Sequence, residues 1–156
     1  SLVALRVFRL DPSVAGKTVG ALSMTATKTV ALDSLAFVHD ISITERYIVI
    51  VIPPWEVEAP SEVIASLISG PLAKRFSWNA ASGARVVVLD RITLDVIADV
   101  ETDPSAGDLS FYHVVNAFDN DDDGDSLILH IAAHNGPRAA VENAFGDMYA
   151  AAWDDS

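Results

Sequence analysis

Short runs of apolar and β-branched residues recur along the chain, and turn-forming residues separate them. The clearest runs are YIVIVI at residues 47–52 and RVVVL at residues 85–89. Such runs have the length and composition of β-strands, whereas a helix needs a longer segment with a period near 3.6. A chain of many short strands with regular turns predicts a sandwich, a barrel or a propeller.

Strands are predicted at several places along the sequence: residues 3–10, 35–44, 47–52, 74–78, 85–90, 94–100, 110–118 and 126–133. Pro53-Pro54 ends one of them, because proline cannot donate to a ladder. Two segments favour short helices instead. Residues 60–69 contain a capping serine near their start, and residues 138–153 are alanine-rich with apolar side chains on one stripe. The pattern predicts an all-β chain with one or two short helices.

The charge and composition of the chain exclude several classes of function. The sequence has 22 acidic residues against 10 basic ones, a net charge of −12 that repels the phosphates of nucleic acids. No stretch approaches the roughly 20 apolar residues needed to span a bilayer, so we expect a soluble protein with no transmembrane segment. With no cysteine, any metal must be held by His, Asp or Glu.

Two of the four histidines stand in predicted strands that are otherwise apolar. His39 lies in FVHDISIT, and His113 lies in FYHVVNAF. Strand alternation puts His39 on the face of Ile41 and Ile43, and His113 on the face of Val115. An imidazole on an apolar face is costly without a partner, and either a metal ion or a backbone carbonyl would satisfy it.

The two histidine segments resemble those of a known family. HDISIT at residues 39–44, followed by Tyr47, is similar to the HDF-x-x-T-x-x-Y segment of carotenoid cleavage oxygenases. YHVVNAFD at residues 112–119 resembles the FH-x-x-NA-[YF]-[ED] segment of the same family. Arg75-Phe76, between them, is similar to its RF/RI strand. The order of the segments is that of the family, and the similarity covers residues 3–133.

The resemblance implies a seven-bladed β-propeller with Fe(II) on its axis, held by four histidines from four blades. His39 matches the second of these ligands and His113 the third. Their separation fits strands one to two blades apart, at about 40 to 50 residues per blade. The implied reaction uses O₂ to cleave a conjugated carbon–carbon double bond in a carotenoid, an apocarotenoid or a stilbene-type compound. We expect Phe37, Phe111 and Phe118 to supply apolar surface near the histidines, and we expect the protein in the cytoplasm or a plastid.

The first and fourth ligands that the family implies would lie outside residues 1–156. We therefore expect these residues to form a single, incomplete propeller domain cut from a longer protein. Its open edge strands would favour self-association. Asp40 follows His39 directly, so in a strand it would point to the opposite face and could not support His39 there.

Other polar clusters favour simpler explanations. His130 and His134 would lie on one face of a strand but about 13 Å apart, too far to chelate one ion, so we expect them at the surface. Residues 119–125 (DNDDDGD) resemble the start of an EF-hand loop. Position twelve would be His130 rather than a bidentate glutamate, so a solvated hairpin turn is expected. No acidic pair stands in a distinctive glycosidase motif.

The sequence leaves two functions open. The first is part of an Fe(II) oxygenase acting on carotenoids or apocarotenoids, with His39 and His113 as metal ligands. The alternative is a non-catalytic, truncated β-rich module that binds an apolar ligand or a protein partner. Because two imidazoles hold iron poorly, the isolated chain is expected to be inactive.

Overall fold

The computed structural model describes residues 3–11, 23–32, 35–36, 38–57, 76–79, 81–104, 111–120, 122 and 126–133. These residues form β-strands and the turns between them, with no α-helix among them. Within this part of the chain, no helix is long and apolar enough to cross a membrane. The two predicted helices, residues 60–69 and 138–153, lie outside the described residues.

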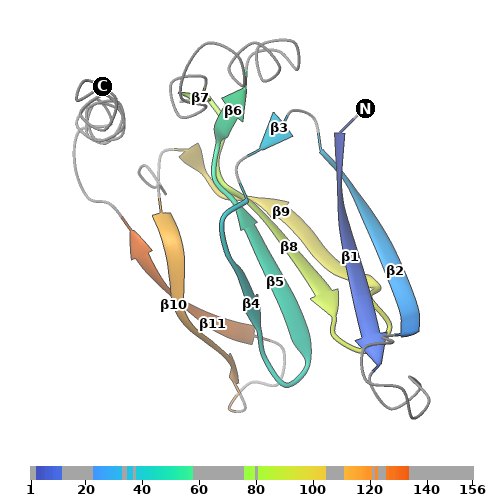
Figure 1. Ribbon diagram of the computed structural model, residues 1–156. Helices are drawn as coiled ribbons and strands as arrows, with labels where there is room; N and C mark the ends of the chain where they lie inside the picture. Colours follow the sequence, from blue (N-terminus) through green and yellow to red (C-terminus); the bar gives the residue numbers. More distant parts are fainter. Residues whose placement is uncertain are drawn as a thin grey trace, which may run out of the picture.

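A four-stranded antiparallel sheet with the order β4-β5-β8-β9 forms the centre of the structure (Figure 1). Its strands are β4 (Ile41–Ile43), β5 (Tyr47–Ile52), β8 (Arg85–Asp90) and β9 (Val96–Glu101). The two middle strands pair without a bulge, from Tyr47 opposite Asp90 to Ile52 opposite Arg85. A four-stranded antiparallel sheet is the repeating unit, or blade, of a β-propeller.

Two long hairpins flank this sheet, one on each side (Figure 1). Both are antiparallel: β1 (Val3–Asp11) with β2 (Ser23–Leu32), and β10 (Phe111–Asn120) with β11 (Ser126–Ala133). A smaller sheet has the order β3-β6-β7, from β3 (Leu35–Ala36), β6 (Trp55–Val57) and β7 (Phe76–Trp78). The chain thus places three layers of antiparallel strands side by side.

The two middle strands of the central sheet, β5 and β8, are largely buried, and side chains on both of their faces pack against a neighbouring hairpin. One face packs against β1–β2 in a cluster of Val30, Leu32, Ile48, Ile50, Ile52, Val87, Leu89 and Leu94. The other face packs against β10–β11 through Val49, Val51, Ala84 and Val88, with Val114, Leu127, Leu129 and Ile131 against them. A buried aliphatic side chain contributes about 1.5–3 kcal/mol, so these two clusters are the main source of stability. Burial of both faces explains why β5 is apolar throughout.

The all-β prediction is confirmed, but one predicted strand is wrong. Residues 35–44 do not form one strand, because β3 and β4 belong to different sheets. Residues 38–40, between them, lie outside any strand. The chain crosses from one sheet to another at this point, and a pattern of alternating residues cannot show that change. His39 therefore lies just before β4 rather than within a strand.

Candidate metal centre

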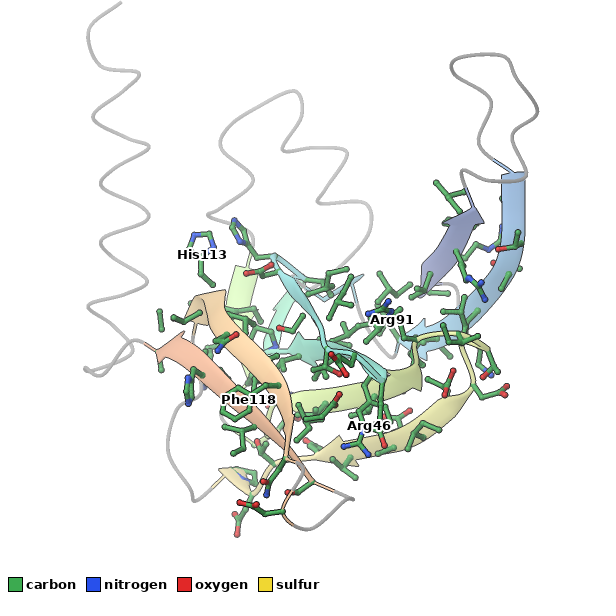
Figure 2. The ribbon with its side chains drawn as sticks, turned by 90° about the horizontal axis from the view of Figure 1, so that it is seen from below. Arg46, Arg91, His113 and Phe118 are labelled. Atoms are coloured by element: carbon green, nitrogen blue, oxygen red, sulfur yellow. The ribbon has the colours of Figure 1, made fainter. Side chains whose placement is uncertain are left out.

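His39 and His113 lie next to each other, although they come from distant parts of the sequence. Their ring centroids are 5.1 Å apart, and the ring planes are inclined at 78°. His39 stands before β4, the edge strand of the central sheet. His113 stands near the start of β10, where Figure 2 labels it. The structure thus brings together the two residues that the sequence predicts as metal ligands.

The spacing of the two rings fits a shared metal ion. An imidazole nitrogen binds a first-row metal at about 2 Å and lies roughly 1.2 Å from its ring centre, so two imidazoles on adjacent positions of one ion have centroids roughly 4.5–5.5 Å apart. The observed 5.1 Å lies within this range. Imidazole is a ligand that iron accepts. Within the described ranges, no group of three or more His, Asp or Glu side chains could hold an ion.

The predicted apolar face around the histidines is not buried in this chain. Ile41 and Ile43 are 50% and 58% exposed, whereas Ser42 and Thr44 between and after them are buried. The apolar side of β4 therefore faces outward, and its polar side faces the neighbouring strands. This is the reverse of the usual order. On the buried side, the hydroxyl of Thr44 contacts Asp119 of β10.

Strand alternation holds around His113, although the pairing of β10 is irregular. The pairing of β10 with β11 shifts register between Phe111 and His113, and again between Val114 and Asn116. Val114 packs toward the central sheet, whereas the side chain of His113 is 70% exposed and Val115 is 69% exposed. His113 and Val115 therefore share a face, but that face is open rather than apolar and buried.

Asp40 joins the two histidine segments. Its Oδ2 accepts a 2.9 Å hydrogen bond from the backbone N–H of Val114, and its Oδ1 accepts one of 2.9 Å from Ile41. The same Oδ2 lies 3.8 Å from Nδ1 of His113. The sequence excluded Asp40 as a support for His39; the structure places it against His113 instead. The pKa of Asp40 is lowered, mainly by the hydrogen bond from the Val114 N–H. Partial burial acts in the opposite direction, and the Ile41 N–H and both imidazoles lower the pKa further.

A second carboxylate, Asp119, joins the far ends of the same strands. Its Oδ1 accepts a 2.8 Å hydrogen bond from Thr44 Oγ1, and its Oδ2 accepts one of 3.1 Å from the backbone N–H of Arg46. The Arg46 Nε lies 3.5 Å from Oδ2. Burial raises the pKa of Asp119, but these donors and the Arg46 charge outweigh it, so the pKa lies below its ordinary value. The prediction that Asp119 belongs to a solvated turn is wrong, because its side chain is only 8% exposed.

The two carboxylate contacts show that β4 and β10 run in the same direction. Asp40 precedes β4 and meets Val114 near the start of β10, and Thr44 follows β4 and meets Asp119 near the end of β10. β4 is also the edge strand of its sheet. Neighbouring edge strands of this kind are expected at the channel of a propeller, where adjacent blades meet.

The other predicted residues lie away from the histidine pair. His130 is exposed on β11, as expected, and its ring is 5.5 Å from that of Phe118. Phe118 lies about 16 Å along the strand from His113, at roughly 3.3 Å per residue, so it does not line the pair (Figure 2). The acidic segment does connect two antiparallel strands, β10 and β11, as predicted. Phe37, His134 and the side chain of Phe111 lie outside the described residues.

Comparison with known proteins identifies the family. The family described as retinal pigment epithelial membrane protein, RPE65, matches residues 2–155. The chain belongs to this family of carotenoid oxygenases. The membership predicted from the two histidine segments is therefore confirmed.

Two curated relatives also match part of this chain. "Carotenoid cleavage dioxygenase 8 homolog A, chloroplastic" of Oryza sativa subsp. japonica is 28% identical over 111 residues, which is 70% of this chain and 18% of that protein. "Carotenoid isomerooxygenase" of Galleria mellonella is 28% identical over 104 residues, which is 67% of this chain and 19% of that protein. The chain thus spans about a fifth of the length of the relatives that it matches.

Solved structures support the fold. Cobalt-substituted ACO of Synechocystis superposes with a TM-score of 0.60 at 18% identity, over 86% of this chain and 24% of that one. An ACO/RPE65 chimera gives 0.59 at 19% identity, with the same coverage. Together with the layered antiparallel sheets, this likeness confirms that the chain is an all-β part of a propeller.

Proposed function

We propose that this chain supplies two iron ligands, His39 and His113, to a non-haem Fe(II) oxygenase. The whole protein would oxidatively cleave a conjugated carbon–carbon double bond of a carotenoid or apocarotenoid. The observation that carries the proposal is the placement of the two rings 5.1 Å apart, at a spacing suited to one shared ion. Membership of the carotenoid oxygenase family supports the substrate class.

The proposed reaction is balanced without an added reductant. One double bond breaks, both atoms of one O₂ enter the products, and two carbonyl groups form. Bound iron would supply the activation of O₂, a reaction that protein side chains alone do not perform. His39 and His113 would hold it through neutral imidazoles, and the exposed Ile41, Ile43 and Val115 would offer apolar contacts to a polyene.

Metal content and product analysis test the proposal. The whole protein that contains this chain, and its His39→Ala, His113→Ala and His130→Ala variants, are loaded with Fe(II) without oxygen, and bound iron is measured. Cleavage of a carotenoid or apocarotenoid is then followed under ¹⁸O₂. We expect loss of iron and of labelled carbonyl products for the first two variants. The His130 variant should match the unaltered protein, because that residue lies on β11 away from the pair. Full iron content in both His39→Ala and His113→Ala would refute the assignment.

A second candidate function is binding of an apolar ligand or a protein partner without catalysis. The exposed apolar side chains of β4 and β10, Ile41, Ile43 and Val115, favour it. It predicts saturable binding of an apocarotenoid that is independent of iron and of both histidines. A single incomplete propeller domain, self-association through edge strands, use of O₂ and location in the cytoplasm or a plastid all stay predictions.

A further inference from the structure

The contact between Asp40 and Val114 lies directly beside the histidine pair. Asp40 is the residue after His39, and Val114 is the residue after His113. Their hydrogen bond of 2.9 Å therefore fixes the backbone of one histidine segment against the other. The second carboxylate oxygen accepts the N–H of Ile41, which holds the carboxylate in one orientation.

We infer that Asp40 is a positioning residue that sets the distance and orientation between the His39 and His113 rings. The inference deepens the proposed function and rests on it for the metal-binding consequence alone. The contact between Asp40 and the backbone of β10 is independent of any metal.

The pairing of β10 explains why a side chain from another strand can make this contact. In the described part of the chain β10 forms a ladder with β11 alone, and Val114 itself is opposite Ile131 in that ladder. The other edge of β10 is therefore open to an acceptor from β4 and its flanks. Asp40 supplies the acceptor for Val114, and an ionised acceptor makes a stronger hydrogen bond than a neutral one.

The carboxylate also lies near the His113 ring. Its Oδ2 is 3.8 Å from Nδ1, which is longer than a hydrogen bond, so the contact with the ring is electrostatic. The placement of His113 therefore rests on the hydrogen bond to the Val114 backbone. Groups around a metal site that orient its histidines typically change metal affinity by about 10- to 100-fold.

The inference is tested in the whole protein that contains this chain, with Asp40→Ala, Asp40→Asn and the control Asp122→Asn. Asp122 is also an acid on the β10–β11 hairpin, but it is exposed and remote from the ring pair. Three measurements are made: nuclear Overhauser effects between the two imidazole rings, hydrogen exchange of the Val114 amide, and Co(II) affinity by visible absorption. The first two need no metal.

Asp40→Ala should weaken the ring-to-ring signals, speed exchange of the Val114 amide at least tenfold, and weaken Co(II) binding by about tenfold or more. Asp40→Asn keeps an oxygen acceptor of the same shape, so it should largely restore the exchange protection and only partly restore Co(II) affinity. Asp122→Asn should change none of the three. If Asp40→Asn folds but Asp40→Ala does not, the asparagine variant decides through Co(II) affinity and ring signals.

Unchanged ring signals and unchanged Val114 exchange in folded Asp40→Ala would overturn the inference. Where only Asp40→Asn folds, unchanged Co(II) affinity together with unchanged ring signals would overturn it. Weak or absent Co(II) binding by the unaltered protein would instead count against the proposed function. In that case the ring signals and the amide exchange still decide whether Asp40 positions the histidines.

Discussion

Thr44 Oγ1 donates a 2.8 Å hydrogen bond to Oδ1 of Asp119, although 75 residues separate them. Thr44 occupies the threonine of the first histidine segment, and Asp119 occupies the acid at the end of the second. The residues that accompany the histidines in the two segments therefore hold the segments together. Asp40 does so at the histidine end, and Asp119 does so at the other end.

Asp119→Ala is expected to destabilise the protein by about 2–3 kcal/mol, because hydrogen bonds to a charged group contribute about 1.5–3 kcal/mol and the variant removes the acceptor shared by Thr44 and Arg46. Urea unfolding followed by tryptophan fluorescence measures the loss. Asp122→Ala, at an exposed position on the same hairpin, should stay within about 0.5 kcal/mol of the unaltered protein. Equal stability of the two variants would mean that Asp119 does not link β10 to β4.

Stability should fall on acidification. The pKa values of Asp40, Asp99 and Asp119 lie below their ordinary value: the Val114 N–H is the main cause at Asp40, and a hydrogen bond from Arg85 is the main cause at Asp99. At Asp119, hydrogen bonds from Thr44 and Arg46 outweigh the opposing effect of burial. A carboxylate whose pKa is lower in the folded than in the unfolded state stabilises the folded state. This contribution is complete above the unfolded pKa of about 3.9, and it is lost as the pH falls through the folded pKa.

Urea midpoints measured from pH 7 to pH 3 check this prediction. They should change little down to about pH 5 and then fall, since the unfolded state binds more protons below that point. Asp119→Asn should show a shallower fall, and Asp122→Asn should keep the slope of the unaltered protein. A stability that rises on acidification would contradict the direction of all three shifts.

The strands that the sequence predicted best are those with the simplest environment. β5, β8 and β11 have the predicted bounds, because long apolar or alternating runs directly record burial. β2 was missed: its threonines and lysine conceal an alternation that buries Val30 and Leu32 against the central sheet. β6 was missed because Pro53-Pro54 signalled the end of a strand, whereas a new strand begins at Trp55.

In the candidate site, the sequence predicted the histidines but not the contacts that hold them in place. The histidines were predicted because their segments resemble those of a family, and the structure places the two rings together. Asp40 and Asp119 were not assigned their contacts, since each depends on a partner more than 70 residues away. The two register shifts in β10 had no signal in the sequence either.

Gly83→Ala is expected to destabilise the protein by about 2–4 kcal/mol, because a Cβ at this position would overlap the carbonyl oxygen of Thr102. The backbone cannot move away easily, since the Gly83 N–H donates to Glu101 Oε1 at 2.8 Å and Ala84 exchanges hydrogen bonds with Thr102. Thermal unfolding measures the change. Ser82→Ala, one residue earlier, tests for a general effect of the turn and should shift the midpoint little.

The two faces of β5 allow a direct test of the layered arrangement. Ile50 is buried against β1–β2, and Val51, the next residue, is buried against β10–β11. Replacing either by alanine should cost about 2–4 kcal/mol through lost burial and a cavity, whereas Ile97→Ala on the exposed β9 should cost less than about 0.5 kcal/mol.

Amide hydrogen exchange then separates the two β5 variants. Ile50→Ala should speed exchange mainly in β1 and β2, because its side chain contacts that layer, and Val51→Ala should speed exchange mainly in β10 and β11. If the central sheet is a blade between two others, each substitution loosens one neighbour and leaves the opposite one protected. The same pattern of exchange in both variants would show that the three layers open as one unit, and that the hairpins have no separate contact with the faces of β5.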